Sequence, residues 1–390
     1  MPADVASAIL QPATAADLAG ALREAVSNKQ AIHLFGAASK RLMAGPVGSA
    51  PVAISSTSLN RVLAYEPHDL TISVEAGLPW RELTALLAAN RQMIPLDPPF
   101  ASTATIGGVI SANCSGPRRR LYGTARDLVI GMTFATLEGK LVQTGGMVVK
   151  NVAGLDMGKL MIGSFGTLAA IVSVNFKLIP MPESERGFLL PFADVGSAIA
   201  ARNQILQSAL QPAAIDLLNP AAGASLGKRS FLLAIRVSGN AAAVERYERE
   251  LAPLSDGVAL DGDPHQTLWS HISEFTPNYL AAHPNGAVVR SSCTLKEVEE
   301  EMSSFPGPAI ARAASGVCYG YFEDAPSAAA WRGPVRARAS QSVIEFAPES
   351  AKPTLQLWPS PGPDFSLMQR VKGMFDPANL LNRGRLYGRI

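Results

Sequence analysis

The sequence contains little cysteine. Its 390 residues include only Cys114, Cys293 and Cys318, which lie far apart and form no Cys-x-x-Cys pair. Zinc sites, iron–sulfur clusters and disulfide frameworks need closely spaced or more numerous cysteines, so this pattern favours none of them. We therefore expect three reduced, mostly buried thiols and no bound metal.

A net charge of one sign is also missing. Lys and Arg number 34 against 32 Asp and Glu, so the formal net charge is +2. This balance gives no reason to expect nucleic acid or an anionic membrane as the partner.

Long apolar runs are absent as well. No uninterrupted apolar stretch reaches the roughly 18 residues of a transmembrane helix, and "MPADVASAIL" at the start lacks the basic and apolar regions of a secretory signal. We expect a cytoplasmic protein without a transmembrane segment. Peripheral attachment at the inner membrane through partner subunits stays open.

The sequence does contain helices and strands in mixed order. Thr14 is positioned to cap a helix, and "AIHLFG" predicts a short strand. Alternation of Leu70, Ile72 and Val74 predicts a half-buried strand, and "PWRELTALLAANRQ" predicts a helix with Pro79 in its first turn. The first half therefore reads as α+β.

The texture changes along the chain. Glycine-rich turns separate strands over residues 101–182, and "MPESERG" (181–187) is a plausible domain boundary. Ala-rich helical stretches then alternate with strands to about residue 350, which indicates a second α+β domain. A Pro-rich connector, "LWPSPGPDFSLMQRVKGMFDP", leads to the basic tail "NLLNRGRLYGRI".

Three turns of small residues are candidates for binding one extended ligand. They are "GAASK" (36–40), "STATIGG" (102–108) and "GSFGT" (163–167). Such turns leave backbone N–H groups uncovered, which lets them donate to a phosphate or pyrophosphate. A Gly-Gly pair alone is equally consistent with a bend in a sheet.

Four segments in this order resemble a known family. "HLFGAASK", "PLDPPFASTATIGGVISANCSGPRRRLYGTARDLVIGM", "GGMVVKNVAGLDMGKLMIGSFGTLAAI" and "FDPANLLNRGRLYG" are similar to the FAD-binding fold of the vanillyl-alcohol oxidase type, also called PCMH-type. Within that fold they most resemble the FAD-binding subunits of bacterial glycolate oxidases. The resemblance is strong over the first 180 or so residues, fair in the tail and weak between.

The resemblance implies a fold and a domain division. It implies an α+β, two-subdomain FAD-binding domain over residues 1–182, with subdomains of about 1–70 and 71–182. An α+β cap or substrate domain follows over 183–365, and the C-terminal tail, 366–390, returns to pack on the FAD domain.

It also implies a set of cofactor-binding residues, matched position by position. These residues are Gly36, Ala37, Ala38, Ser39, Lys40, Pro99, Thr103, Thr105, Ile106, Gly107, Gly108, Gly116, Tyr122, Gly123, Gly163, Gly166, Thr167 and Ile171. Covalent flavin attachment in this fold uses a His near the first loop, where this chain has Lys40 and Arg41. We therefore expect non-covalent FAD.

Three consecutive arginines, Arg118, Arg119 and Arg120, follow Gly116-Pro117. On an exposed turn near the flavin they would steer a small carboxylate or pair with acidic residues of a partner subunit. A solvated charge cluster with little energetic role is the alternative.

Catalytic residues are not evident. Relatives that oxidise 2-hydroxy acids unaided carry a His-x-His element late in the chain, and this chain has none among its five isolated histidines. His271 and His283, with Arg290 nearby, are the only candidates in the presumed substrate domain.

The resemblance therefore implies a subunit of a complex. Its partners would be a second FAD subunit and an iron–sulfur subunit of glycolate oxidase, and its substrate glycolate, oxidised to glyoxylate. Two alternatives stay open: a stand-alone FAD-dependent oxidoreductase for a 2-hydroxy acid or alditol, and a non-catalytic assembly subunit with a structural flavin.

Overall fold

The N-terminal end of the chain forms a small parallel sheet. The computed structural model describes residues 9–148, 155–332 and 342–390. β1 (Ile9–Leu10), β3 (Val52–Ser55) and β2 (Ile32–Phe35) pair in that order, and α1 (Ala15–Ser27) follows β1. The predicted cap of α1 is confirmed, because the Thr14 hydroxyl accepts from Asp17 N at 3.1 Å and Thr14 N donates to the Asp17 carboxylate.

A five-stranded antiparallel sheet completes the first lobe. Its order is β4 (Val62–Glu66), β5 (Thr71–Glu75), β9 (Ala170–Lys177), β7 (Val129–Ala135) and β8 (Leu141–Gly145). The strand around Ile72 and Val74 is present, but the prediction that it is half-buried is wrong. All of β5 is buried, because it lies between β4 and β9 and the polar residues of its second face are covered too. Leu70, with φ of 54°, stands outside the strand.

Short elements surround this sheet. They are α2 (Trp80–Ala89), α3 (Ile106–Ser111), α4 (Arg119–Tyr122), α5 (Ala125–Leu128), α6 (Met157–Met161) and the pair β6 (Gln92–Met93) and β10 (Ile179–Pro180). Pro79 lies just before α2 rather than in its first turn. Its ψ of 135° is extended, and Trp80 N donates to Ala104 O at 2.8 Å.

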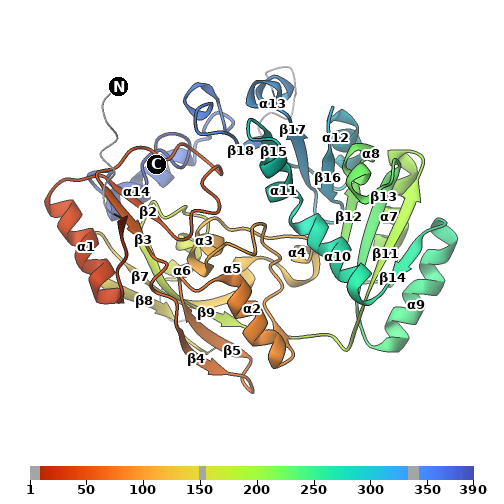
Figure 1. The fold of residues 1–390 in the computed structure, drawn as a ribbon, viewed down its shortest axis with the longest axis horizontal. Coiled ribbons are helices and arrows are strands. Elements are labelled where there is room, and N and C mark those ends of the chain that lie inside the picture. Colours follow the sequence, from red (N-terminus) through yellow and green to blue (C-terminus); the bar gives the residue numbers. More distant parts are fainter. Residues whose placement is uncertain (1–8, 149–154, 333–341) are drawn as a thin grey trace.

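The second lobe is built on an eight-stranded antiparallel sheet (Figure 1). Its order is β14 (Val258–Leu260), β11 (Ser184–Phe192), β13 (Phe231–Gly239), β12 (Ala214–Leu218), β16 (Ala309–Arg312), β17 (Val317–Phe322), β15 (Ala287–Ser292) and β18 (Ser342–Phe346). β11 begins at Ser184, next to the predicted limit between the first two domains. We keep the domain limits 1–182, 183–365 and 366–390 as a proposal.

Helices cover both faces of this sheet. α7 (Val195–Gln207), α9 (Ala241–Leu251), α12 (Val298–Ser304) and α13 (Ala325–Arg332) share the outer hydrophobic cluster, and α8 (Pro220–Gly223) follows β12. α10 (Gly262–Ser273) and α11 (Phe275–Ala282) lie on the face toward the first lobe (Figure 1). Leu268 and Trp269 of α10 belong to the same buried cluster as Ile106 and Ile110 of α3, so the two lobes share one core.

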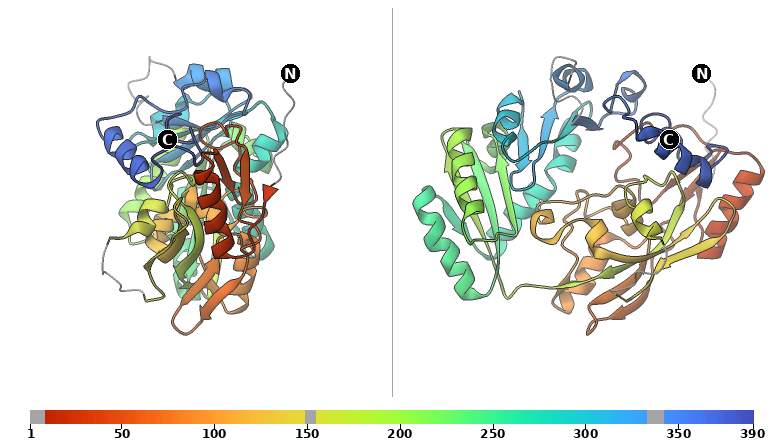
Figure 2. Two further views of the ribbon diagram at one scale, coloured as in Figure 1. Left: turned by 90° about the vertical axis from the view of Figure 1, so that its left-hand side faces the viewer. Right: turned by 180° about the vertical axis from the view of Figure 1, so that it is seen from behind.

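The C-terminal segment returns to the first lobe, as Figures 1 and 2 show. Ile32 N donates to Leu380 O at 2.8 Å. The second half of the predicted Pro-rich connector forms a helix, α14 (Phe365–Phe375). Pro359, Pro361 and Pro363 precede the helix and Pro377 follows its end, so no proline interrupts it. The α+β fold with a returning tail is thus confirmed.

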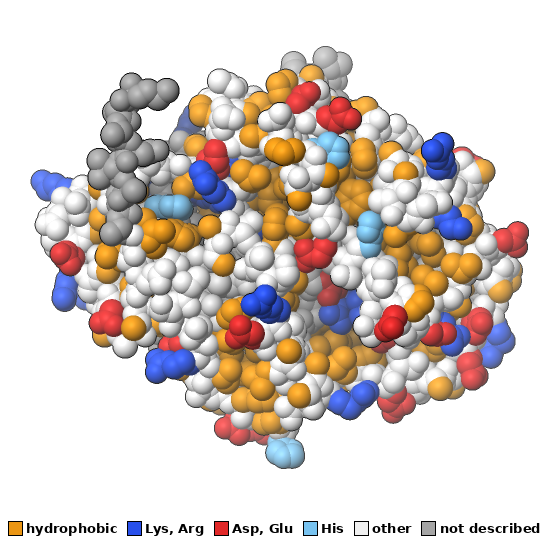
Figure 3. Space-filling model, in the orientation of Figure 1, with side chains coloured by type: hydrophobic (Ala, Val, Ile, Leu, Met, Phe, Trp, Pro, Cys, Tyr) orange, Lys and Arg blue, Asp and Glu red, His pale blue; other side chains and the backbone are white. Residues whose placement is uncertain are grey.

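Neither metal-binding clusters nor membrane spans are present in the described parts of the chain. No group of three or more His, Cys, Asp or Glu is arranged to hold a metal ion, and no helix is long and apolar enough to cross a membrane. Figure 3 shows charges of both signs scattered over one face. Cys114 and Cys318 are buried and Cys293 is half-buried. None of the three forms a disulfide, and Cys293 Sγ and Cys318 Sγ lie 4.0 Å apart.

Candidate functional site

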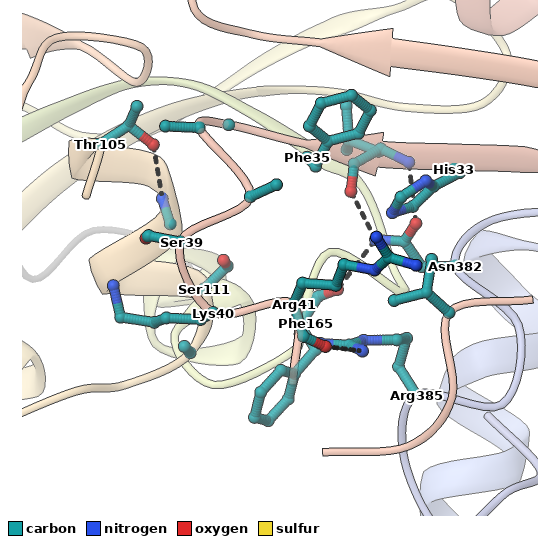
Figure 4. Close-up of a pocket in the computed structure, with 17 residues that line it drawn as sticks. His33, Phe35, Ser39, Lys40, Arg41, Thr105, Ser111, Phe165, Asn382 and Arg385 are labelled. Carbon is teal, nitrogen blue, oxygen red and sulfur yellow. Dashed lines mark hydrogen bonds between the residues drawn. The ribbon is translucent and has the colours of Figure 1, made fainter. Parts of the chain in front are cut away.

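The loop after β2 forms one wall of a cavity in the first lobe (Figure 4). The first residue of this loop is Gly36, where a side chain would not fit. A Cβ there would lie 2.2 Å from Thr105 Oγ1. Ala38 has φ of 54°, and Arg41 N donates to Ala38 O at 3.0 Å. A left-handed residue in such a turn brings successive N–H groups toward one side, a geometry that suits anions.

The start of α3 forms the second wall. Thr105 caps this short helix, and its Oγ1 accepts from Gly108 N at 3.3 Å. Gly107 is needed for packing, because its N donates to Ala76 O at 2.7 Å and a Cβ would lie 2.9 Å from the Ala76 side chain. Glycine here lets α3 approach the end of β5 closely.

The turn before β9 forms the third wall. Phe165 and Gly166 have φ of 52° and 66°. A Cβ on Gly166 would lie 2.9 Å from Asn382 Nδ2, and Asn382 donates to Phe165 O and Leu34 O, both at 3.0 Å. The C-terminal tail therefore holds this turn against β2.

The tail supplies one further lining residue, Arg385, as Figure 4 shows. Arg385 donates to Gly45 O at 2.7 Å and lies over the Phe165 ring at 5.8 Å. Burial lowers the pKa of Arg385 to about 10. Lys352 donates to Arg41 O at 3.3 Å and fixes the end of the first loop from outside the cavity.

These three walls enclose what we call the loop cavity. It has two connected parts, which share six residues. Its residues are His33, Leu34, Phe35, Gly36, Ala37, Ala38, Ser39, Lys40, Arg41, Val47, Ser56, Thr105, Gly107, Gly108, Ser111, Ala112, Phe165, Gly166, Ala169, Ile171, Asn382 and Arg385.

A second cavity of about 290 Å³ lies between the lobes. We call it the arginine cavity, because Arg119, Arg290 and Arg312 line it. Its other residues are Met43, Pro99, Ala112, Asn113, Cys114, Ser115, Thr124, Gly163, Phe165, Ser273, Thr276, Tyr319, Glu345 and Phe346. Ala112 and Phe165 line both cavities, so the two adjoin.

Lys40 is a buried cation without a described partner. Its Nζ has no hydrogen bond among the described residues, its side chain faces the Phe100 ring at 5.8 Å, and the residue is 9% exposed. Burial lowers the pKa of Lys40, which Cys114 and Glu274 oppose only in part. An unpaired buried ammonium is costly unless an anionic ligand compensates it.

The arginines of the second cavity differ in their pairing. Arg312 forms an ion pair with the buried Asp216. Burial raises the pKa of Asp216 to about 6. Arg290 Nε lies 3.0 Å from Glu345 Oε1. Arg119 donates to Ser115 Oγ at 3.3 Å and forms no ion pair with any described residue. Arg119 is therefore the arginine with charge left for a ligand.

Most sequence-predicted residues border these cavities. The loop cavity includes Gly36, Ala37, Ala38, Ser39, Lys40, Thr105, Gly107, Gly108, Gly166 and Ile171, and the arginine cavity includes Pro99, Gly163, Arg119 and Arg290. Thr103, Ile106, Gly116, Tyr122, Gly123, Thr167, Arg118, Arg120, His271 and His283 line neither.

The predicted exposed arginine turn is wrong for Arg118. Its side chain is 13% exposed, and its Nε donates to both oxygens of Asp97. Arg120 instead donates to Pro212 O at 3.0 Å in the second lobe. The three arginines diverge because α4 is helical, and side chains on consecutive helix residues face different directions.

The two histidine candidates lie away from the cavities. His271 Nε2 is 2.9 Å from Ser225 Oγ, and His283 stacks on the Tyr279 ring at 4.2 Å. The residues that sequence reasoning missed are Ser111, Phe165, Tyr319, Arg312, Glu345, Asn382 and Arg385. Phe165 lies within the predicted "GSFGT" turn, and Asn382 and Arg385 lie in the tail segment that carries the resemblance.

The loop cavity fits FAD on the observations above. It offers small-residue turns for a pyrophosphate, a buried cation without a partner, and room that a Cβ on Gly36 or Gly166 would reduce. The part lined by Gly107 and Gly166 and the arginine cavity both adjoin the space beside residues 36–40 through shared lining residues. An elongated dinucleotide is the ligand class that this arrangement suits.

Comparison with known proteins agrees with this fit. Residues 6–145 match the FAD binding domain family, and residues 360–386 match the C-terminal domain of the FAD linked oxidases. The chain is 32% identical over 196 residues to "Glycolate oxidase subunit GlcE" of Escherichia coli (strain K12), covering 50% of this chain and 54% of that protein.

Two further matches extend the comparison. "Glycolate oxidase subunit GlcD" of Bacillus subtilis (strain 168) is 31% identical over 161 residues, 41% of this chain and 34% of that protein. The chain thus spans about half or less of the length of these relatives. The crystal structure of p-cresol methylhydroxylase with substrate bound has a TM-score of 0.75 at 15% identity, over 97% of this chain and 88% of that one. These matches identify an FAD binding domain at residues 6–145 and an FAD linked oxidase C-terminal segment at residues 360–386, and the chain shares the fold of p-cresol methylhydroxylase.

Proposed function

We propose that the chain is the FAD-binding subunit of a glycolate-oxidase-type complex that oxidises glycolate to glyoxylate. The observation that carries this proposal is the adjacency of the two cavities. Ala112 and Phe165 line both, so a substrate in the arginine cavity would meet a cofactor held in the loop cavity.

The loop cavity would hold FAD without a covalent bond. The backbone of residues 36–40, Thr105 and Gly108 would face the pyrophosphate, and Gly166 and Ile171 line the part suited to the adenine end. Lys40 would compensate negative charge on the ligand. When bound, FAD supplies the acceptor for a hydride, the hydrogen and electron pair of a substrate C–H bond.

The arginine cavity would hold the substrate carboxylate. Guanidinium groups bind carboxylates with two parallel hydrogen bonds, and Arg119 has no carboxylate partner among the described residues. Three arginines and one glutamate line this cavity, which leaves an excess of positive charge for a small anion. These features favour a 2-hydroxy acid over an alditol, which carries no charge.

The partners are part of the proposal. Similarity to two different glycolate oxidase subunits supports assembly with a second FAD subunit and an iron–sulfur subunit. We propose a cytoplasmic location, with any attachment to the inner membrane made through those partners. The complex would pass the substrate's electrons from flavin to the iron–sulfur subunit.

Native co-purification tests this function. The chain is isolated with its bound subunits, flavin is quantified per chain, and flavin bleaching is followed anaerobically with glycolate and with D-lactate. Bleaching by glycolate in a complex that contains an iron–sulfur protein supports the proposal. Turnover by the chain alone would instead support a stand-alone oxidoreductase, and flavin that neither acid bleaches would support an assembly subunit.

A further inference from the structure

One carboxylate lines the arginine cavity among the described residues, and it belongs to Glu345. Glu345 lies in β18, next to β15 in the sheet, and its side chain is 15% exposed. Its Oε1 is 3.0 Å from Arg290 Nε on β15. The carboxylate is thus held in one orientation at the wall of the cavity proposed for the substrate.

The surroundings of Glu345 come from several elements. The charged or titratable groups that interact electrostatically with Glu345 are Arg290 of β15, Arg119 of α4, Tyr319 and Tyr321 of β17, and Cys114. Burial raises the pKa of Glu345 above its ordinary value, against the opposing charges of Arg290 and Arg119. A carboxylate whose pKa is raised toward neutrality is a more effective general base.

Oxidation of a 2-hydroxy acid needs a base for the hydroxyl proton, and the other candidates are unsuitable. Neither His271 nor His283 lines the arginine cavity. Burial raises the pKa of Tyr319 to about 12 and that of Cys114 to about 11, so both keep their protons at neutral pH. Glu345 is the lining group that remains to accept a proton.

We propose that Glu345 accepts the hydroxyl proton of the substrate, an inference that rests on the proposed function. The O–H bond of the hydroxy acid breaks and its proton passes to the Glu345 carboxylate. FAD, when bound, would supply the acceptor for the hydrogen on the hydroxyl-bearing carbon together with its electron pair, which would leave a carbonyl. Arg290 is a positioning residue that fixes the carboxylate.

Proton-linked binding tests this assignment without turnover. Oxalate is used as a two-carboxylate anion that the enzyme cannot oxidise in this way. An anion bound beside Glu345 favours protonation of the carboxylate, so calorimetry in two buffers of different ionisation enthalpy should show uptake of up to about one proton per oxalate. The uptake should vanish in Glu345→Gln.

A matched control separates this role from loss of a buried ion pair. Glu185 pairs with Arg236 at 2.9 Å outside both cavities. The Glu185→Gln complex should keep the oxalate-linked proton uptake and the rate of flavin bleaching by glycolate. Glu345→Gln should bleach about 10²- to 10⁴-fold more slowly, the range that general acid–base catalysis contributes.

The outcomes distinguish the two proposals. The role of Glu345 is overturned if glycolate bleaches the flavin of the Glu345→Gln complex at the wild-type rate. It is also overturned if the wild-type complex binds oxalate without proton uptake. Should Glu345→Gln fail to fold, Glu345→Asp carries the test: uptake retained with a slower rate supports the role, and both unchanged from wild type overturns it. A wild-type flavin that no 2-hydroxy acid bleaches overturns the proposed function instead, and oxalate-linked uptake would then show only that Glu345 takes up a proton when an anion binds.

Discussion

The side-chain amide of Asn382 donates a 3.0 Å hydrogen bond to the main-chain oxygen of Phe165, which precedes it by 217 residues. The same amide donates to Leu34 O, and its Oδ1 accepts from Leu34 N at 2.8 Å. One side chain thus joins the C-terminal tail to two walls of the loop cavity.

Replacing Asn382 with Ala should weaken both the fold and the cofactor site. Three hydrogen bonds disappear and leave partly buried backbone groups unpaired, at a cost of about 1–3 kcal/mol. Thermal melting and flavin content per chain measure the two effects. Arg383→Ala changes an exposed neighbour and should alter stability by no more than about 0.5 kcal/mol. Equal flavin content in the two variants would contradict the anchoring role.

Gly36→Ala should release flavin. The added Cβ would lie 2.2 Å from Thr105 Oγ1, so the loop or α3 must shift and deform the proposed pyrophosphate site. Absorbance of the flavin near 450 nm, about its usual maximum, is measured per purified chain. Gly20→Ala in α1 is the control, because nothing lies within 4 Å of its added Cβ. Full flavin content in Gly36→Ala would show that the loop is wrongly assigned.

Lys40→Met should affect the FAD-free and FAD-loaded forms in opposite directions. Removing an unpaired buried charge should raise the melting temperature of the FAD-free chain, and losing a cation should weaken FAD binding at least about tenfold. Lys228→Met, on an exposed residue, should do neither. Unchanged FAD affinity in Lys40→Met would contradict the counter-charge role.

The same lysine predicts a pH dependence. Burial lowers the folded-state pKa of Lys40, so between that value and the unfolded value of about 10.4 the unfolded chain binds more protons. The contribution of Lys40 to stability in the FAD-free chain should therefore rise with pH across this window. Melting of wild type and Lys40→Met over that range should converge at high pH. Parallel curves would be the contrary result.

Arg119→Gln should raise the KM for glycolate at least about tenfold, because it removes the arginine that lacks a carboxylate partner. The kcat should change less, since charge on the carboxylate is similar before and during the reaction. Steady-state kinetics of the complex with an artificial electron acceptor measure both constants. Arg120→Gln, whose side chain bonds Pro212 O outside the cavity, should leave the KM unchanged.

Asp97→Asn should remove acid-sensitive stability. Burial raises the pKa of Asp97, but pairing with Arg118 outweighs it and holds that pKa below its ordinary value. The pair therefore stabilises the fold above the unfolded pKa of about 3.9 and loses this effect as pH falls through the lower folded value. The variant should lose about 3–5 kcal/mol at pH 7 and show a flatter pH dependence in acid. Asp69→Asn, on an exposed residue, is the control for melting between about pH 7 and pH 3.

Much of the fold could be predicted because its signals are local. The Thr14 cap and the strand before Gly36 depend on neighbours within a few residues. Where prediction was wrong, the cause was distant. β5 is a central strand whose Ile72 and Val74 pack in the shared core with residues of α2 and α3, and Arg118 is buried because Asp97 lies next to it.

The sequence by itself determined the glycine-bearing turns, the order of strands and helices, and the resemblance to FAD-binding oxidoreductases. Only the tertiary structure decided which side chains face the ligand space. Arg290 and Glu345 meet because β15 pairs with β18, and Asn382 reaches Phe165 because the tail docks on β2. Strand pairing and tail docking depend on contacts between residues far apart in the chain, which local sequence patterns do not encode.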